Sequence, residues 1–193
     1  RTRADFRRRK EASCPGKTFA VIGGGFIGSE LASSLTQAGS KVIMLFPEAH
    51  VCSAVTTPAH GEVLTQMFRD QGVDVRPGVT VETVRRSGPK LLVAIGGDDP
   101  QTLRVDGVVA GIGTKPNTLL AEGAGLEVDD GIVVDASFRS SDADVFAAGD
   151  VAAFWSIPLG RTLRVEHEDH ANASGLLAGK AMAGATVAYD HLP

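Results

Sequence analysis

The order of apolar and polar positions predicts alternating strands and helices in the first part of the chain. Three short apolar runs have the length of buried strands: 18–22, 41–46 and 73–78. Two stretches between them have apolar residues at helical spacing: 26–39 and 58–72. Pro58 near a start and Gly72 at an end suit helix termini. This β-α-β-α-β order predicts a parallel sheet with helices on its faces.

After Gly78 the pattern changes to short β-rich runs separated by Gly, Pro and Asp. These runs predict an antiparallel meander: 79–87, 90–97 and 101–113. Pro116 interrupts the pattern, and we expect a domain boundary there. Four elements are expected beyond it: a short helix near 119–124, strands at 131–135 and 144–150, and a long helix within 166–184.

Composition narrows the class of protein. With 193 residues, 43% of them hydrophobic, the chain can form one domain, or one domain and part of another. Its formal net charge of −4 argues against nucleic acid as the main partner, because duplex binding uses clustered Lys and Arg. No apolar run reaches the roughly 18 residues of a membrane-spanning helix. Cys14 and Cys52 form no C-x-x-C pair, which indicates a reducing intracellular compartment and no dithiol centre.

The first ten residues, RTRADFRRRK, contain six basic side chains. An Arg-rich transit peptide has this composition. A solvated linker helix inside a longer protein is the preferred interpretation, because the strand pattern begins a few residues later. We therefore expect residues 1–16 to be a linker and the chain to be a fragment.

The stretch VIGGGFIGSE, between the first strand and the first helix, has the chemistry of a phosphate cradle. Gly23, Gly25 and Gly28 have G-x-G-x-x-G spacing. In this pattern the first glycine permits a tight turn, the second lets the main chain approach a pyrophosphate, and the third packs helix on strand. The helix amino terminus adds free N–H groups and partial positive charge. A glycine turn without a ligand is the alternative, but the strand–turn–helix context favours a dinucleotide.

Glu48 follows Gly28 by twenty residues, near the expected end of the second strand. An acid at this place accepts hydrogen bonds from the adenosine ribose and repels a 2′-phosphate. The interval from Phe46 to Pro58 holds no Lys or Arg to bind that phosphate. The sequence therefore predicts NAD in preference to NADP.

Later stretches connect the chain to a known family. DVFAAGDVA and GIGTKPN, with the glycine motif and the meander, resemble the two-dinucleotide flavoproteins of the pyridine-nucleotide disulfide oxidoreductase superfamily. More closely, GGGFIGSELA, LFPE and RVEHEDHA are similar to the apoptosis-inducing factor family of mitochondrial flavoproteins. The resemblance covers most of the chain. It implies FAD and NAD as cofactors and a mitochondrial location.

The same resemblance implies which residues contact the cofactors. Glu48 would bind the adenosine ribose of NAD, Gly113 would lie on the nicotinamide side, and Asp150 would hold the ribityl chain of FAD. Glu166 and His167 would lie where NAD and flavin meet. The full set of implied cofactor-binding residues is Gly23, Gly24, Gly25, Phe26, Ile27, Gly28, Glu48, Gly113, Asp150, Glu166 and His167.

Three residues are implied at the reacting centre: Phe26, Glu30 and His167. Phe26 would shield the flavin face until nicotinamide displaces its ring, Glu30 would lie in the same pocket, and His167 would tune the flavin. The chain departs from the family at two places, with Glu168 where the family often has His and Ala54 where it often has Lys.

Simpler interpretations of these residues stay open. Phe26 suits a core, and Glu30 suits the helix dipole. The acids within 166–169 suit a helix start. His167 and His170, three apart, could share a metal, but no third ligand is indicated and no metal is expected.

The resemblance also implies the domain organisation. We expect an α/β protein with a Rossmann-like NAD-binding domain, a parallel sheet plus an antiparallel meander, at 17–115. The returning part of a split FAD-binding domain is expected at 116–193. The family's first FAD glycine motif and its C-terminal domain have no counterpart in this sequence.

The predicted function of the parent protein is FAD-dependent NADH oxidation, with hydride transfer from NADH to flavin and onward to an unidentified electron acceptor. One alternative is a non-catalytic NAD-binding or signalling module produced by truncation. Another is a sister reductase serving ferredoxin, rubredoxin or monodehydroascorbate. Flavin absorbance would separate an enzyme from a colourless module. The oligomeric state, a homodimer included, and the activity of the isolated fragment stay open.

Overall fold

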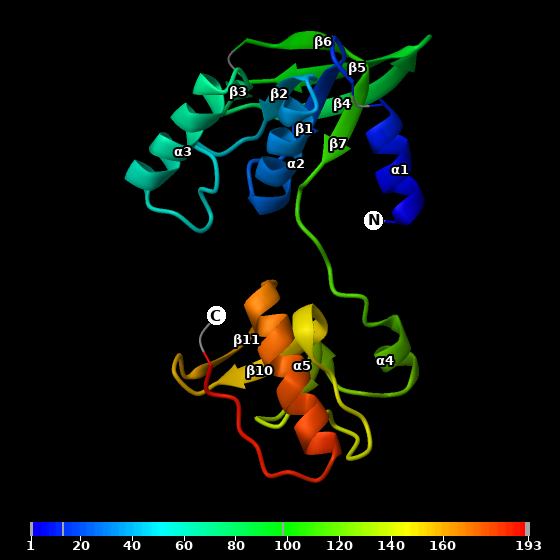
Figure 1. Ribbon diagram of the computed structural model, residues 1–193, viewed down its shortest axis with the longest axis vertical. Coiled ribbons are helices and arrows are strands. Elements are labelled where there is room, and N and C mark those ends of the chain that lie inside the picture. Colours follow the sequence, from blue (N-terminus) through cyan, green and yellow to red (C-terminus); the bar gives the residue numbers. More distant parts are fainter. Residues whose placement is uncertain (1, 13, 98, 192–193) are drawn as a thin grey trace. The chain divides into compact units, whose positions relative to one another are not determined.

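The computed structural model describes residues 2–12, 14–97 and 99–191 (Figure 1). The chain forms two compact units, Arg1–Gly113 and Thr114–Pro193, each with its own hydrophobic core. Both units combine helices with strands, which confirms the α/β class.

A four-stranded parallel sheet is the centre of the first unit. Its strands, in spatial order, are β3 (Asp74–Arg76), β2 (Lys41–Leu45), β1 (Thr18–Ile22) and β7 (Gly107–Ala110). Helices follow β1 and β2 in the chain: α2 (Phe26–Gln37) and α3 (Pro58–Asp70). The predicted β-α-β-α-β order and Rossmann-like fold are therefore confirmed.

Both faces of this sheet are covered by other elements. Alternate residues of each strand point to opposite faces, so one strand contributes to two separate core clusters. Phe19 and Val21 of β1 share one core cluster with Leu35 of α2. Ala20 lies in a second cluster with Val93 of an antiparallel meander. Figure 1 shows the helices and this meander on opposite sides of the sheet. The meander consists of β4 (Thr80–Ser87), β5 (Lys90–Gly96) and β6 (Gln101–Val105).

The expectation that 101–113 belongs to the meander is wrong for its second half. β6 pairs antiparallel with β5, but after Asp106 the chain turns and β7 pairs parallel with β1. A Cβ on Gly107 would lie 2.3 Å from the Phe19 ring, so β7 can approach β1 only with glycine there. Short β-rich runs carry no signal for which sheet they join.

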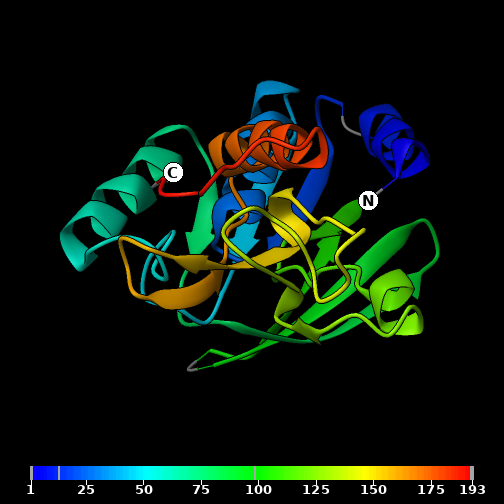
Figure 2. The ribbon, with the colours of Figure 1, turned by 90° about the horizontal axis from the view of Figure 1, so that it is seen from below.

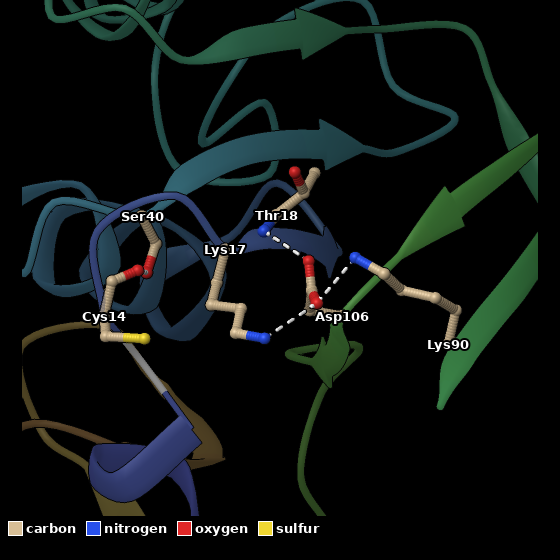
Figure 3. A network of polar contacts seen from close by, with 6 residues as sticks. All are labelled: Cys14, Lys17, Thr18, Ser40, Lys90 and Asp106. Carbon is tan, nitrogen blue, oxygen red and sulfur yellow. Dashed lines mark hydrogen bonds and ion pairs between the residues drawn. The ribbon is translucent and has the colours of Figure 1, made fainter. Parts of the chain in front are cut away.

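Asp106 holds the corner between β6 and β7 (Figure 3). Its carboxylate, whose side chain is 10% exposed, accepts Lys90 Nζ from the meander at 2.6 Å and Lys17 Nζ at 3.4 Å. It also accepts the Thr18 N–H at 2.9 Å, while the Asp106 N–H donates to the Thr18 carbonyl at 2.8 Å. The bonds from Lys90 and the Thr18 N–H lower the pKa of Asp106 to about 2. One carboxylate thus ties the meander to the start of β1.

The second unit contains a mixed four-stranded sheet. Its strands, in spatial order, are β11 (Arg161–Arg164), β10 (Ala152–Ser156), β9 (Gly131–Val134) and β8 (Val128–Asp129). Three helical elements accompany it: α4 (Leu119–Gly123), the 3-10 turn η1 (Gly149–Val151) and α5 (Glu168–Met182). The two helices and the strand near 131–135 that the sequence predicts are present.

An aromatic cluster forms the core of this unit. Phe138 and Tyr189 meet edge to face at 4.9 Å between ring centroids, and Phe154 and Tyr189 do so at 5.0 Å. The segment after α5 runs back along that helix (Figure 2). It is fixed there because the Tyr189 hydroxyl bonds His170 Nδ1 at 2.8 Å.

The predicted strand at 144–150 is wrong. Within this segment only Phe146 forms an isolated bridge, with Arg139, before the chain enters η1. The Ala147 N–H donates to the Phe138 carbonyl at 3.0 Å, so the segment bonds to a turn. The Ser140 N–H likewise donates to the Val145 carbonyl at 2.9 Å, so main-chain groups that a strand would pair with a sheet are bonded to this turn instead. β10 and β11 pair antiparallel as a hairpin that was not expected from the sequence.

The basic opening stretch is helical, since α1 spans Arg3–Ala12. Over the described ranges, no helix is long and apolar enough to cross a membrane.

Replacing Asp106 with Asn should weaken the fold in a pH-dependent way. The folded-state pKa of about 2 lies below the unfolded value of about 3.9, so the carboxylate stabilises the fold above about pH 4. That contribution is lost as the pH falls towards 2. We expect D106N to lower the urea midpoint at pH 7 and to match the unmodified chain near pH 2. Urea unfolding across this range measures the difference, with E62Q on the exposed face of α3 as control. An equal deficit at both ends of the range would contradict an ionic origin.

Candidate functional site

The carboxyl ends of β1, β2 and β7 lie at one edge of the parallel sheet. The register pairs Ile22 with Leu45 on one side and with Ala110 on the other. Gly23, Phe46 and Gly111 therefore follow neighbouring strands. The chain passes from β1 outward to β3 on one side and later adds β7 on the other, so this edge contains the topological switch point where ligands bind in such sheets.

The glycines of the turn after β1 serve different physical needs. A Cβ on Gly23, whose φ is 108°, would lie 2.2 Å from the Gly111 carbonyl oxygen, and one on Gly28 would lie 2.0 Å from the Gly23 carbonyl oxygen. A Cβ on Gly24 would lie 2.7 Å from Cγ of the Phe46 ring. A Cβ on Gly25, in contrast, would meet nothing within 4 Å. Three glycines are thus required by packing, and Gly25 faces open space.

The amino end of α2 begins at this open position. Gly25 is its N-cap, no side chain caps the helix, and its first turn contains no acid. The first N–H groups of an α-helix have no partner within the helix, and they carry partial positive charge. An exposed glycine at such an end fits the close approach of a pyrophosphate.

The loop after β2 is hydrogen-bonded to the glycine turn. The Cys52 N–H donates to the Gly24 carbonyl at 2.8 Å. Cys52 is buried and has a positive φ of 57°, which is uncommon for a residue other than glycine. No sequence pattern predicts this contact, because it involves only the main chain of Cys52.

Glu48 lies just beyond β2 with an exposed side chain. Its carbonyl accepts the Gly78 N–H at 3.1 Å, which joins it to the segment after β3. Arg76, the last residue of β3, donates to Asp74 Oδ2 at 2.8 Å and to Gln101 Oε1 at 3.0 Å. The Arg76 guanidinium is therefore already hydrogen-bonded to other side chains.

The first turn of α2 presents apolar side chains at the same edge. Phe26 is 63% exposed and Ile27 is 39% exposed, while Glu30 is also exposed. Ile27 Cγ2 would lie 3.2 Å from a Cβ on Gly111. Phe26 is therefore no core residue. Gly113, with φ 101°, ends the first unit.

A second group of expected site residues lies in the second unit. Asp150 belongs to η1 and is exposed, and the Gly149 N–H beside it donates to Ser174 Oγ at 2.9 Å. His167 is the N-cap of α5, where its Nδ1 accepts the Asp169 N–H at 3.2 Å. The structure thus supports the capping role considered for this stretch.

Glu166 is held by two donors. Its Oε1 accepts the Thr114 hydroxyl, and it also accepts Arg164 Nη1 at 2.6 Å. These bonds, with that of Thr114 the larger effect, lower the pKa of Glu166. Glu166 is therefore ionised at neutral pH and acts as an acceptor. Neither Thr114 nor Arg164 was among the residues expected from the sequence.

His170, considered from the sequence as a metal ligand with His167, is a core residue. It is fully buried, stacked on Phe154 at 4.8 Å and bonded to the Tyr189 hydroxyl. Its Nε2 has no hydrogen-bond partner among the described residues, and burial lowers the pKa of His170. In the described part of the chain, no cluster of three or more His, Cys, Asp or Glu side chains could hold a metal ion.

The sheet order and the glycine turn at its switch point define a Rossmann-like α/β protein. The family can be stated as well. Residues 1–175 match the pyridine nucleotide-disulphide oxidoreductase family, and the chain belongs to that family. Its members bind FAD and NAD(P)H, which confirms the cofactors expected from the sequence.

Curated relatives come from several branches of this family. A ferredoxin–NAD(+) reductase component of the anthranilate 1,2-dioxygenase system of Burkholderia cepacia is 35% identical over all of this chain and 47% of its own length. Peroxisomal monodehydroascorbate reductase 4 of Arabidopsis thaliana is 38% identical, over 90% of this chain and 36% of its own. A putative mitochondrial apoptosis-inducing factor 1 of Drosophila melanogaster is 37% identical, over 99% and 26%. The chain spans less than half the length of each.

A solved structure agrees with this assignment. Putidaredoxin reductase, in its covalent complex with putidaredoxin, has a TM-score of 0.88 and 33% identity, over 99% of this chain and 46% of the reductase.

Alanine at Gly25 and alanine at Gly28 are a matched pair of one-methyl insertions. At Gly28 the methyl meets the Gly23 carbonyl at 2.0 Å, so the main chain must move, and the free energy of unfolding should fall by about 1–3 kcal/mol. At Gly25 the methyl enters open space, and the loss should stay below about 1 kcal/mol. Urea unfolding measures both variants. Equal losses would show that packing does not distinguish the two glycines.

Proposed function

We propose that this chain supplies the NADH-binding domain, at 17–115, and part of the FAD-binding domain, at 116–193, of an FAD-dependent NADH oxidoreductase of the apoptosis-inducing factor type. The main support is the exposed Gly25 at the uncapped amino end of α2, at the switch point of a parallel sheet. Family membership supports the redox chemistry.

In this proposal the glycine turn binds the pyrophosphate of NADH through main-chain N–H groups. Glu48 accepts hydrogen bonds from the adenosine ribose, and its exposed carboxylate repels a 2′-phosphate. Arg76 cannot compensate, because Asp74 and Gln101 already bond its guanidinium. Gly113 lies on the nicotinamide side.

The second unit contributes acceptors suited to a flavin. The exposed Asp150 carboxylate can accept hydrogen bonds from ribityl hydroxyls, and Ser174 holds the turn that carries it. Glu166 and His167 lie at or just before the amino end of α5, where partial positive charge favours an electron-rich ring. When both cofactors are bound, they supply hydride transfer from nicotinamide C4 to flavin N5. The side chains bind, orient and exclude water.

Phe26, Glu30 and His167 are the residues that we assign to the reacting centre. The exposed Phe26 ring would cover the flavin face and yield to nicotinamide, with Glu30 one helical turn away. The ring of His167, fixed by its bond to the Asp169 N–H, would adjust the polarity of the flavin.

The subtype is proposed from RVEHEDHA and from the mitochondrial relative, and it carries a mitochondrial location and a role in apoptosis with it. A monodehydroascorbate reductase is the second candidate, supported by 38% identity to the Arabidopsis relative. Reduction of monodehydroascorbate by the flavin-loaded protein would favour that candidate.

The nucleotide assignment predicts that this chain binds NADH more tightly than NADPH. E48Q removes the negative charge and one acceptor, so the ratio of NADPH to NADH affinity should rise at least about tenfold, or ~1.4 kcal/mol. G25A should weaken NADH binding, because its methyl occupies the space of the pyrophosphate. Isothermal titration calorimetry measures the binding of NADH and NADPH to the unmodified chain, E48Q and G25A, with E62Q as control. Tighter binding of NADPH by the unmodified chain would remove Glu48 from the ribose site, and unchanged NADH binding by G25A would remove the glycine turn.

The assignment of Phe26 predicts separate effects on stability and on reduction. F26A removes an exposed ring and should change the free energy of unfolding by only about 0.5 kcal/mol. F46A removes a ring that is 1% exposed and should cost about 3–5 kcal/mol. In the flavin-loaded protein, F26A should alter the rate of flavin reduction by NADH in stopped-flow measurements. A large loss of stability with unchanged reduction would return Phe26 to the core.

A further inference from the structure

Arg164, the last residue of β11, connects three acceptors from separate parts of the second unit. Its Nη1 donates to Glu166 Oε1 at 2.6 Å and to the Asp150 carbonyl at 3.1 Å, and its Nε donates to Asp130 Oδ1 at 3.3 Å. The Arg164 side chain is only 11% exposed. A guanidinium with so little exposure requires its partners, because an unpaired charge would be costly to bury.

The main chain makes room for this side chain. Gly131, at the start of β9, has φ 118°, and a Cβ there would lie 3.0 Å from Arg164 Cδ and 2.6 Å from the Val151 carbonyl oxygen. The glycine therefore leaves the space through which Arg164 reaches η1. This arrangement is specific to Arg164, since Arg161 at the other end of β11 is exposed.

Glu166 connects Arg164 to Thr114, the first residue of the second unit. Oε1 accepts both Arg164 Nη1 and the Thr114 hydroxyl, so the carboxylate is held from two sides. Within the described residues no donor reaches Oε2, and the Glu166 side chain is 39% exposed. One oxygen is used for position, and the other can accept a hydrogen bond from a ligand.

We propose that Arg164 is a positioning residue that holds the Glu166 carboxylate and the Asp150 main chain in one fixed arrangement, and through Glu166 also fixes Thr114. The forked guanidinium is essential, because a lysine ammonium cannot reproduce its planar set of donors. The importance of this arrangement for cofactor binding rests on the proposed function, in which Glu166 and Asp150 both contact cofactors.

The test uses NMR on the isotopically labelled chain without any cofactor. Two signals are followed: the pH titration of the Glu166 side-chain carboxyl carbon, and the amide resonance of Val151, whose N–H belongs to the same peptide group as the Asp150 carbonyl. We expect R164Q and R164K each to raise the pKa of Glu166 and to shift the Val151 amide. T114V should raise the pKa of Glu166 and leave the Val151 amide unchanged. R161Q, on the same strand, should change neither signal.

The outcomes separate positioning from simple charge. If R164K leaves both signals as in the unmodified chain, the charge alone suffices and the proposal is overturned. The proposal would also be overturned if R164Q changed only one of the two signals, the Glu166 titration or the Val151 amide resonance, and left the other unchanged. If R164Q fails to fold, as seen from its amide spectrum, R164K and T114V still decide. A failure of the proposed function would appear separately, as absence of NADH binding in calorimetry.

Discussion

The close approach of three main-chain segments, at Gly23, Gly28 and Gly111, is the constraint on which the first unit depends. A Cβ at any of them would lie within 2.8 Å of a neighbouring main-chain atom, so β1, α2 and β7 meet at separations that only glycine permits. This contact fixes the amino end of α2 at the carboxyl end of β1, with the exposed Gly25 between them. The anion-binding character of the edge is a consequence of how the helix packs on the sheet.

The second unit is organised by polar groups that hold a turn from both sides. Ser174 accepts the Gly149 N–H, and Arg164 donates to the Asp150 carbonyl. Ser174 is fully buried, and leaving either main-chain group unpaired would cost free energy. Side chains from α5 and β11 therefore fix the turn that carries Asp150.

The sequence predicted what depends on local pattern and missed what depends on distant partners. Strand and helix periodicity gave the parallel sheet, α2 and α3 because each is encoded within a dozen or so residues. The sequence did not predict that the chain leaves the meander at Asp106 and joins the parallel sheet, because Asp106 bonds to Thr18 and Lys90, which are not its neighbours in the chain. The wrong strand at 144–150 has an apolar run, but its main chain bonds to the turn at 138–140 and not to the sheet. The glycine turn was predicted from its spacing, whereas Arg164 had no signal, since its acceptors come from separate segments.

The difference between the glycines has a consequence for how such proteins diverge. A side chain at Gly23 or Gly28 would meet a main-chain carbonyl and lower the stability of the fold, so selection for stability alone would favour glycine at both positions. Gly25 has room for a side chain, so only a ligand would keep it glycine. A descendant that gained a side chain at this one position would stay folded while losing its anion-binding surface. Redox enzymes of this architecture could in this way give rise to stable proteins free to acquire other roles.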